Sequence, residues 1–328
     1  MYAWGAPKTR YLMSIALGLL GLIILVVGAD LLVRGASRLA LGFGIAPLVV
    51  GLTVVAFGTS APELAVSVRT SLAGDSAMAL GNAIGSNMFN ILAIMGIAAI
   101  ISPQAVDSKL IRTDVPIMIA CAAVVWLVAW SGEIARWEAA ILTVLLVIYT
   151  GWTVWKARSE PTEIHLEEVV ITSKLDRILG SKVAQIAAMA VGLGFLVLGS
   201  DLLVDAAVLI ARFFGLSEVV IGLTIVAAGT SMPELATTVV AAVRGEREIA
   251  VGNVVGSNIF NALGVVGLAG VAGGAIAVPQ TVLSVDIPLM FGVSVLVLPI
   301  IYTDSRVSRF EGATLLAGLV AYWTWLLV

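Results

Sequence analysis

The chain has 328 residues, of which 60% are hydrophobic and 12% are charged, whereas ordinary soluble domains are about 45–50% apolar and about 25% charged. The net charge is −3 and no block of basic residues occurs, which argues against nucleic acid as a partner. A single cysteine, Cys121, and a single histidine, His165, leave no intrachain disulfide and no histidine-based catalytic or metal centre. These features exclude a soluble globular protein, argue against an enzyme, and predict a polytopic membrane protein.

Charged residues and prolines divide the apolar sequence into ten predicted membrane helices, so we expect an all-α fold. Runs of about 20 apolar residues suffice to cross a hydrocarbon core about 30 Å thick. The predicted spans lie near residues 11–34, 39–73, 76–101, 112–130, 134–156, 183–212, 217–243, 248–277, 283–303 and 308–328.

Three motifs occur twice, always 171 residues apart. GADLLV at 28 returns as GSDLLV at 199, GLTVVAFGTSAPELA at 51 as GLTIVAAGTSMPELA at 222, and GNAIGSNMFN at 81 as GNVVGSNIFN at 252. A constant offset indicates duplication. We expect a first five-helix repeat over residues 1–156, a cytoplasmic connector over 157–182, and a second five-helix repeat over 183–328. Because the first span carries the first motif, it belongs to the fold rather than to a cleaved signal peptide.

Five spans in each half would make the second half enter the bilayer from the opposite side. Inverted repeats of this kind are typical of secondary transporters, whose site lies between the repeats near the midplane. Thirteen of the eighteen basic residues fall on the same side as the polar connector. The positive-inside rule therefore predicts a cytoplasmic connector and two extracellular termini.

The motifs GTSAPE and GTSMPE, which start at Gly58 and Gly229, place a proline inside a predicted span. Pro62 and Pro233 have no N–H to bond the carbonyl four residues earlier. Unpaired carbonyls in hydrocarbon cost several kcal/mol, so broken helices at this depth normally line a cavity or an ion site. We expect both helices to break at the midplane.

Each of these motifs also carries a carboxylate, Glu63 or Glu234. A carboxylate within the membrane costs about 2.5–3.5 kcal/mol and by default marks an ion path or a proton relay. Hydroxyl, carbonyl and carboxylate oxygens suit Na⁺ and Ca²⁺, and Ca²⁺ takes about 6–8 of them. One motif cannot supply that number, but two motifs that meet can. The hydroxyl residues beside the glutamates are Thr59, Ser60, Thr230 and Ser231.

The third motif adds further hydroxyl and amide groups. Ser86 and Asn90 are four residues apart, as are Ser257 and Asn261, which places each pair on one helix face. Asn87 and Asn258 lie beside them. The glycines of this motif are equally compatible with close helix packing, and the asparagines could also join helices to one another.

Four aspartates are weaker candidates for ion ligands. Asp30 and Asp201 lie near helix ends, where solvation or a helix contact is expected. Asp114 and Asp286 each stand two residues before a proline and are predicted to start helices.

The sequence resembles the cation/Ca²⁺ exchanger superfamily along essentially its whole length. The most specific part of the resemblance is the two motif pairs, GTSAPE with GNAIGSNMFN and GTSMPE with GNVVGSNIFN. The resemblance is greatest to its prokaryotic Na⁺/Ca²⁺ exchanger branch. Proton-coupled members typically carry GN before the glutamate, whereas TS here resembles the sodium-coupled type.

The resemblance implies ten helices with both termini outside and four sites between the second, third, seventh and eighth helices. It implies Glu63 and Glu234 at the centre, with Asn90 and Asn261 beside the middle position. The first and sixth helices would slide to alternate access. The other implied ligands are Thr59, Ser60, Thr230, Ser231, Ser86, Ser257 and the backbone carbonyls of Ala56 and Ala227.

The sequence departs from some members of the superfamily, which have an aspartate where this chain has Asn261. With two carboxylates at the site, one Ca²⁺ cancels the charge and three Na⁺ exceed it. The expectation is electrogenic exchange of Na⁺ for Ca²⁺ by alternating access in a prokaryotic cell membrane, with no cofactor. The alternatives are a proton-coupled divalent-cation antiporter, selectivity for another divalent cation, and a passive cation channel.

Overall fold

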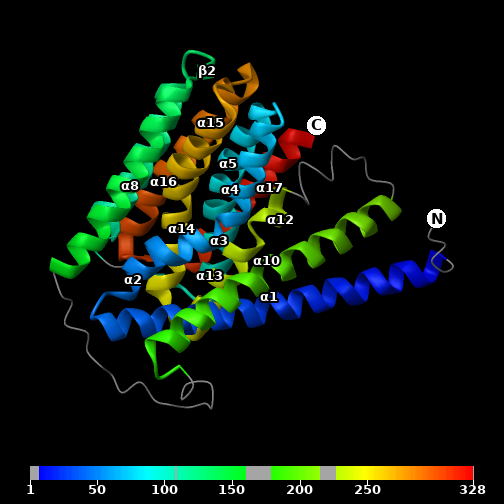
Figure 1. Ribbon diagram of the computed structural model, residues 1–328, viewed down its shortest axis with the longest axis vertical. Coiled ribbons are helices and arrows are strands. Elements are labelled where there is room, and N and C mark those ends of the chain that lie inside the picture. Colours follow the sequence, from blue (N-terminus) through cyan, green and yellow to red (C-terminus); the bar gives the residue numbers. More distant parts are fainter. Residues whose placement is uncertain (1–6, 107, 109, 160–178, 215–226, 328) are drawn as a thin grey trace.

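The computed structural model describes residues 7–106, 108, 110–159, 179–214 and 227–327, and these are almost entirely helical. Figure 1 shows two long helices along one edge of the molecule and a bundle of shorter helices rising from them. The long helices are α1 (Pro7–Phe43) and α10 (Lys182–Phe213).

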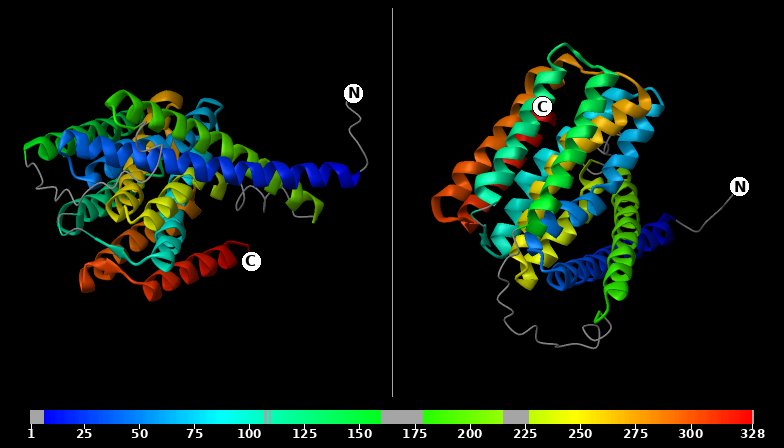
Figure 2. Two further views of the ribbon diagram at one scale, coloured as in Figure 1. Left: turned by 90° about the horizontal axis from the view of Figure 1, so that it is seen from below. Right: turned by 60° about the vertical axis from the view of Figure 1, so that its left-hand side comes forward.

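Helices α1 and α10 run antiparallel and pack closely along their length (Figures 1 and 2). Glycine makes this approach possible: a Cβ at Gly28 would lie 2.8 Å from the carbonyl oxygen of Gly192, and a Cβ at Gly192 would lie 2.7 Å from that of Gly28. Small residues at such crossings let helix backbones meet in a membrane. The two helices therefore form one packed unit.

Helix α1 continues through Arg34 and Arg38, so the predicted break between residues 34 and 39 is wrong. The arginine at 34 is compensated within the helix, because its Nε lies 3.0 Å from Asp30 Oδ2. No proline occurs between Pro7, where α1 begins, and Pro47, where the next helical segment begins.

The second predicted span is broken, as expected. It comprises α2 (Pro47–Val50), the π-helical segment η1 (Gly51–Val55) and α3 (Ala56–Thr59), followed after Ser60 by α4 (Ala61–Leu72). The two parts meet at a bend of 44°. Its counterpart is α12 (Ala227–Thr230) followed after Ser231 by α13 (Met232–Arg244); the start of the predicted span 217–243 lies outside the described residues.

Two long, enclosed helical stretches cross the middle of the bundle. The first consists of α5 (Ser76–Phe89), η2 (Asn90–Met95) and α6 (Gly96–Ile101). The second consists of α14 (Arg247–Phe260), η5 (Asn261–Val265) and α15 (Val266–Gly273). Both change to π-helix at an asparagine of the repeated motif. Segments of this kind are frequent at functional sites.

The remaining helices cover the outside of this centre. Figure 2 shows loops from the two halves meeting at one end of the bundle. The short strands pair Gln104 with Val307 and Glu133 with Ala277. The elements are β1 (Gln104–Ala105), η3 (Leu110–Asp114), α7 (Val115–Ala129), β2 (Glu133–Ile134), α8 (Arg136–Ser159), β3 (Ile276–Ala277), η6 (Val282–Asp286), α16 (Ile287–Asp304), β4 (Arg306–Val307) and α17 (Arg309–Leu327).

The described residues include seven helices long and apolar enough to cross a membrane, or eight when the bent α2–α4 stretch is counted. They cover most of the ten predicted spans. The tenth prediction, 308–328, corresponds to helix α17, which is not among the seven.

Candidate functional site

The two intramembrane glutamates come together at the centre of the molecule. Glu63 lies in the first turn of α4 and Glu234 in the first turn of α13, directly after the two helix breaks. Both side chains are completely buried, at 0% exposure. The breaks thus bring two carboxylates into the interior, where an isolated charge would be costly.

Each glutamate is held by the serine of the other repeat. Ser60 Oγ donates a hydrogen bond to Glu234 Oε1 over 2.7 Å, and Ser231 Oγ donates to Glu63 Oε1 over 2.9 Å. Hydrogen bonds to charged acceptors are the stronger ones in proteins. The two motifs therefore meet in the structure, and that they bind a cation there stays a prediction.

Several polar side chains of the repeated motifs have buried atoms without protein partners among the described residues. Oε2 of Glu63 and Oε2 of Glu234 are buried and accept no hydrogen bond from the described residues. The same holds for the hydroxyls of Ser86 and Ser257 and for both amide atoms of Asn90 and Asn261. Buried polar groups in native proteins almost always have partners. Buried oxygens without protein partners can serve as ligands of a desolvated cation.

The threonines flank the carboxylates on either side. Thr59 Oγ1 lies 3.3 Å from the carbonyl oxygen of Ala56, and Thr59 is also placed beside the Glu234 carboxylate. Thr230 hydrogen-bonds to the Glu63 carboxylate. Ala227 is the first residue of α12.

Two backbone carbonyls named by the sequence analysis, one freed by Pro233 and one an implied ligand, already accept a hydrogen bond. The carbonyl of Gly229 accepts a hydrogen bond from Ser200 Oγ of α10 over 2.7 Å. The Ala56 carbonyl accepts from the N–H of Ser60 over 3.0 Å. Each oxygen therefore has at most one lone pair left for an ion.

Two asparagines that the sequence analysis did not select lie behind the glutamates. Asn82 Nδ2 donates to the Glu63 carbonyl over 3.2 Å, and Asn253 Nδ2 donates to the Glu234 carbonyl over 3.4 Å. A signal for them existed, because Asn82 stands one helical turn before Ser86 in the repeated motif, on the same helix face.

Asn87 and Asn258 do not turn to the glutamates. Asn87 Nδ2 donates to the backbone carbonyl of Asn258 over 3.3 Å and lies 3.6 Å from Met290 Sδ. Asn258 Nδ2 donates to the carbonyl of Val254 over 2.7 Å. Asn87 therefore connects α5 to α14, which was the alternative interpretation of the motif, whereas the Asn258 amide bonds within its own helix.

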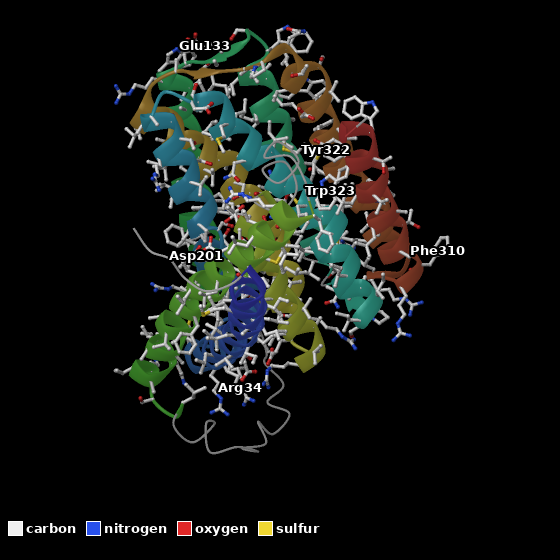
Figure 3. All side chains as sticks on the ribbon, turned by 90° about the vertical axis from the view of Figure 1, so that its right-hand side faces the viewer. Arg34, Glu133, Asp201, Phe310, Tyr322 and Trp323 are labelled. Atoms are coloured by element: carbon white, nitrogen blue, oxygen red, sulfur yellow. The ribbon has the colours of Figure 1, made fainter. Side chains whose placement is uncertain are left out.

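The four aspartates lie away from the pocket. Asp30 pairs with Arg34 and with Arg244 of α13, which is the expected helix contact. Asp201 is exposed on α10 (Figure 3).

Asp114 and Asp286 directly precede α7 and α16, as predicted. Each accepts a hydrogen bond from a tyrosine, Tyr149 over 3.2 Å or Tyr322 over 3.1 Å. The aspartates thus fasten neighbouring helices in both halves.

Within the described part of the chain, no group of three or more His, Cys, Asp or Glu side chains could hold a metal. Two carboxylates together with hydroxyl, amide and backbone oxygens form a donor set for hard cations such as Na⁺ and Ca²⁺. Thiolate and imidazole ligands, which softer transition metals prefer, are not part of this pocket.

Known proteins resemble this chain in sequence, and solved structures resemble it in fold. The chain is 38% identical to the inner membrane protein YrbG of Escherichia coli over 78% of this chain and 79% of that one. It is 32% identical to the sodium/calcium exchanger MaX1 of Methanosarcina acetivorans over 93% of this chain and 95% of the relative. The putative antiporter CaxA of Alkalimonas amylolytica is 35% identical over the same shares.

Solved structures of the sodium-calcium exchanger NCX_Mj superpose on 96% of this chain and 99% of theirs, with a TM-score of 0.82 and 30% identity. The family profile described as sodium/calcium exchanger protein matches residues 13–155 and 184–328, nearly all of both halves. The chain therefore belongs to the sodium/calcium exchanger protein family.

Proposed function

We propose that this membrane protein exchanges Na⁺ for Ca²⁺ at the pocket between Glu63 and Glu234. As a member of its family it is a cation antiporter of the exchanger type. The observation that carries the ionic assignment is the crossed pair of hydrogen bonds, Ser60 to Glu234 and Ser231 to Glu63. These hydrogen bonds link the two glutamates across the halves, and each glutamate keeps one buried oxygen without a protein partner, which supports a shared cation site.

The proposed ligands are the two glutamates and the hydroxyl and amide groups around them. A carbonyl lone pair at Ala56 and one at Ala227 would complete the Na⁺ positions. The remaining proposed ligands are Thr59, Ser60, Thr230, Ser231, Ser86, Ser257, Asn90 and Asn261. Na⁺ and Ca²⁺ would compete for overlapping members of this set, which is the basis of coupled exchange.

Transport requires that the pocket open to each side in turn, because both glutamates are fully buried. We propose that α1 and α10 move together across the rest of the molecule, since they pack as one unit. The arrangement would be two inverted five-helix repeats, residues 1–156 and 183–328, joined by a cytoplasmic connector over 157–182. Both termini would be extracellular in a prokaryotic cell membrane.

Two carboxylates without a cation repel each other in a medium of low dielectric constant. Crossing with an empty pocket is therefore unfavourable, which couples the two fluxes. Three Na⁺ would leave the pocket with a charge of opposite sign from its empty state, whereas one Ca²⁺ neutralises it. We expect exchange to move net charge.

Proton coupling is the second candidate. The observation in its favour is that each glutamate has an unpartnered buried oxygen, which a proton could occupy as well as a cation could. A passive channel receives less support, because the complete burial of both carboxylates does not suit a continuous pore.

Proteoliposomes separate these functions. An outward Na⁺ gradient at constant pH should drive uptake of radioactive Ca²⁺, and a membrane potential set with valinomycin should change its rate. Uptake driven by a pH gradient without Na⁺ would establish proton coupling instead. Ca²⁺ flux that does not depend on any counter-ion gradient would establish a channel.

A further inference from the structure

Asn253 of α14 joins one proposed ligand of the first half to another of the second. Its side chain is completely buried, at 0% exposure. Nδ2 donates to Thr238 Oγ1 over 3.0 Å and to the Glu234 carbonyl over 3.4 Å. Oδ1 accepts from Thr59 Oγ1 over 3.1 Å. One amide thus contacts α3 and α13 and uses both its donor and its acceptor.

The contact with Thr59 determines where the hydroxyl hydrogen points. A hydroxyl binds a cation through its lone pairs, so its single hydrogen must be directed elsewhere. Three acceptors lie near Thr59: the Ala56 carbonyl, the Glu234 carboxylate and Asn253 Oδ1. The first two are themselves proposed ligands. Donation to Asn253 leaves the remaining lone pair of the Ala56 carbonyl and the Glu234 carboxylate oxygens available to the ion.

The orientation of the Asn253 amide follows from its other contacts. If nitrogen and oxygen were exchanged, Oδ1 would face the carbonyl oxygen of Glu234, which has no hydrogen to donate. The amide nitrogen would then donate to Thr59 and cover a lone pair that the ion needs. Assigning amide atoms from such networks is standard practice; here the Glu234 carbonyl, which can only accept, sets the orientation, and the two threonine hydroxyls are compatible with it.

The first half contains the same arrangement in a weaker form. Asn82, which is 171 residues before Asn253, donates to Ser67 Oγ over 2.9 Å and to the Glu63 carbonyl over 3.2 Å. Ser67 is the counterpart of Thr238. Asn82 is half-buried, whereas Asn253 has no exposed surface. Water can therefore replace part of the hydrogen bonding that Asn82 provides.

We propose that Asn253 is a positioning residue for cation binding: it fixes the backbone of Glu234 and accepts the hydrogen of Thr59, so that hydroxyl lone pairs face the ion. Asn82 has the corresponding role toward the backbone of Glu63. This inference rests on the proposed cation site, and it assigns a function to residues that would not touch the ion. Groups that orient metal ligands commonly change metal affinity by about 10–100-fold when they are removed.

The test compares cation binding by purified full-length variants in detergent. The thermal midpoint is measured while Ca²⁺ and Na⁺ are titrated separately, because a ligand that binds the folded state raises this midpoint. Asn253→Ala should raise the half-saturating concentration about tenfold or more, and Asn82→Ala should raise it less. Gln104→Ala is the matched control, since it removes another buried amide that bonds a carbonyl, in β1 and outside the repeated motifs.

A double-mutant cycle tests whether Asn253 acts through Thr59. Thr59→Val removes the hydroxyl, so adding Asn253→Ala to it should weaken binding less than Asn253→Ala does in the wild-type background. An additive result would overturn this role. So would an Asn253→Ala protein whose midpoint falls without cation while its half-saturating concentrations stay within about twofold of wild type. Because no gradient is involved, the result decides the inference even if flux proves to be proton-coupled.

Discussion

The internal repeat gives equivalent contacts at the centre of the molecule but not along the α1–α10 pair. At the centre, equivalent residues make equivalent contacts, since Ser60 bonds Glu234 and Ser231 bonds Glu63 at almost equal distances. The asparagines behind the glutamates follow the same rule. The centre is therefore close to symmetric in its bonding, as a pocket shared by two antiparallel halves should be.

The two ends of the α1–α10 pair are unlike each other. Asp30 of α1 pairs with Arg244, and Ser37 Oγ donates to Glu246 Oε1 over 2.8 Å, so this part of α1 is fastened to the α13–α14 turn. The equivalent of Asp30 on α10 is Asp201, which is exposed, and no described basic side chain pairs with it (Figure 3). A symmetric centre with asymmetric edges is consistent with the alternating access proposed above, in which one side is closed while the other is open.

The largest effect is expected at the centre. Glu63→Gln and Glu234→Gln should each abolish Na⁺-dependent uptake of radioactive Ca²⁺, because each removes one of the two buried charges that face the cation. Equal loss in both variants would support a shared pocket. Near-normal uptake by either variant would mean that its glutamate does not bind the transported ion.

A second comparison concerns the packing of the pair itself. Gly192→Ala would place a methyl group 2.7 Å from the Gly28 carbonyl oxygen, whereas a Cβ at Gly194 of the same helix meets no atom within 4 Å. Overpacking of this kind typically costs about 1–3 kcal/mol. The Gly192 variant should therefore lose thermal stability and exchange rate, while Gly194→Ala should resemble wild type. Similar midpoints for both variants would contradict the close contact.

The symmetry of the centre can be measured with the serines. Ser60→Ala and Ser231→Ala each remove one hydrogen bond to a carboxylate, which is worth about 1.5–3 kcal/mol. Both should weaken apparent cation affinity by about tenfold or more, and to a similar extent. Half-saturating Na⁺ and Ca²⁺ concentrations for exchange would show this. A strong effect of one serine and none of the other would disprove equivalence.

The smallest effect is expected at the edges, where side chains are partly exposed. Asp30→Asn should lower the free energy of unfolding by about 1 kcal/mol or less, the usual range for such ion pairs. Asp201→Asn, the equivalent change on α10, should leave it unchanged. Chemical denaturation in detergent would compare the two. Equal destabilisation would show that the asymmetry is not energetically significant.

The sequence repeat was sufficient to predict the centre, because a motif that recurs at one fixed offset must occupy equivalent places in both halves. It predicted the helix breaks before Glu63 and Glu234 and the convergence of these glutamates. Whether the serines would bond within their own half or across to the other could not be read from spacing, since that depends on how the halves pack.

Other features depend on contacts between distant residues and could not be foreseen. The continuity of α1 through Arg34 relies on compensation by Asp30 and Arg244. The Gly229 carbonyl accepts a hydrogen bond from Ser200. The counterpart of Ser200 on α1 is Ala29, which has no hydroxyl to donate. Small departures from the repeat thus distinguish the two halves where the glutamate motif does not.

The central claim is that two carboxylates from opposite halves bind one cation. Its most direct test is a crystal structure with Sr²⁺ or Ca²⁺ in which anomalous scattering locates the ion. We predict a single divalent ion in contact with oxygens of both Glu63 and Glu234, at about 2.3–2.6 Å for Ca²⁺. An ion bound by only one of these glutamates, or located away from both, would contradict the account.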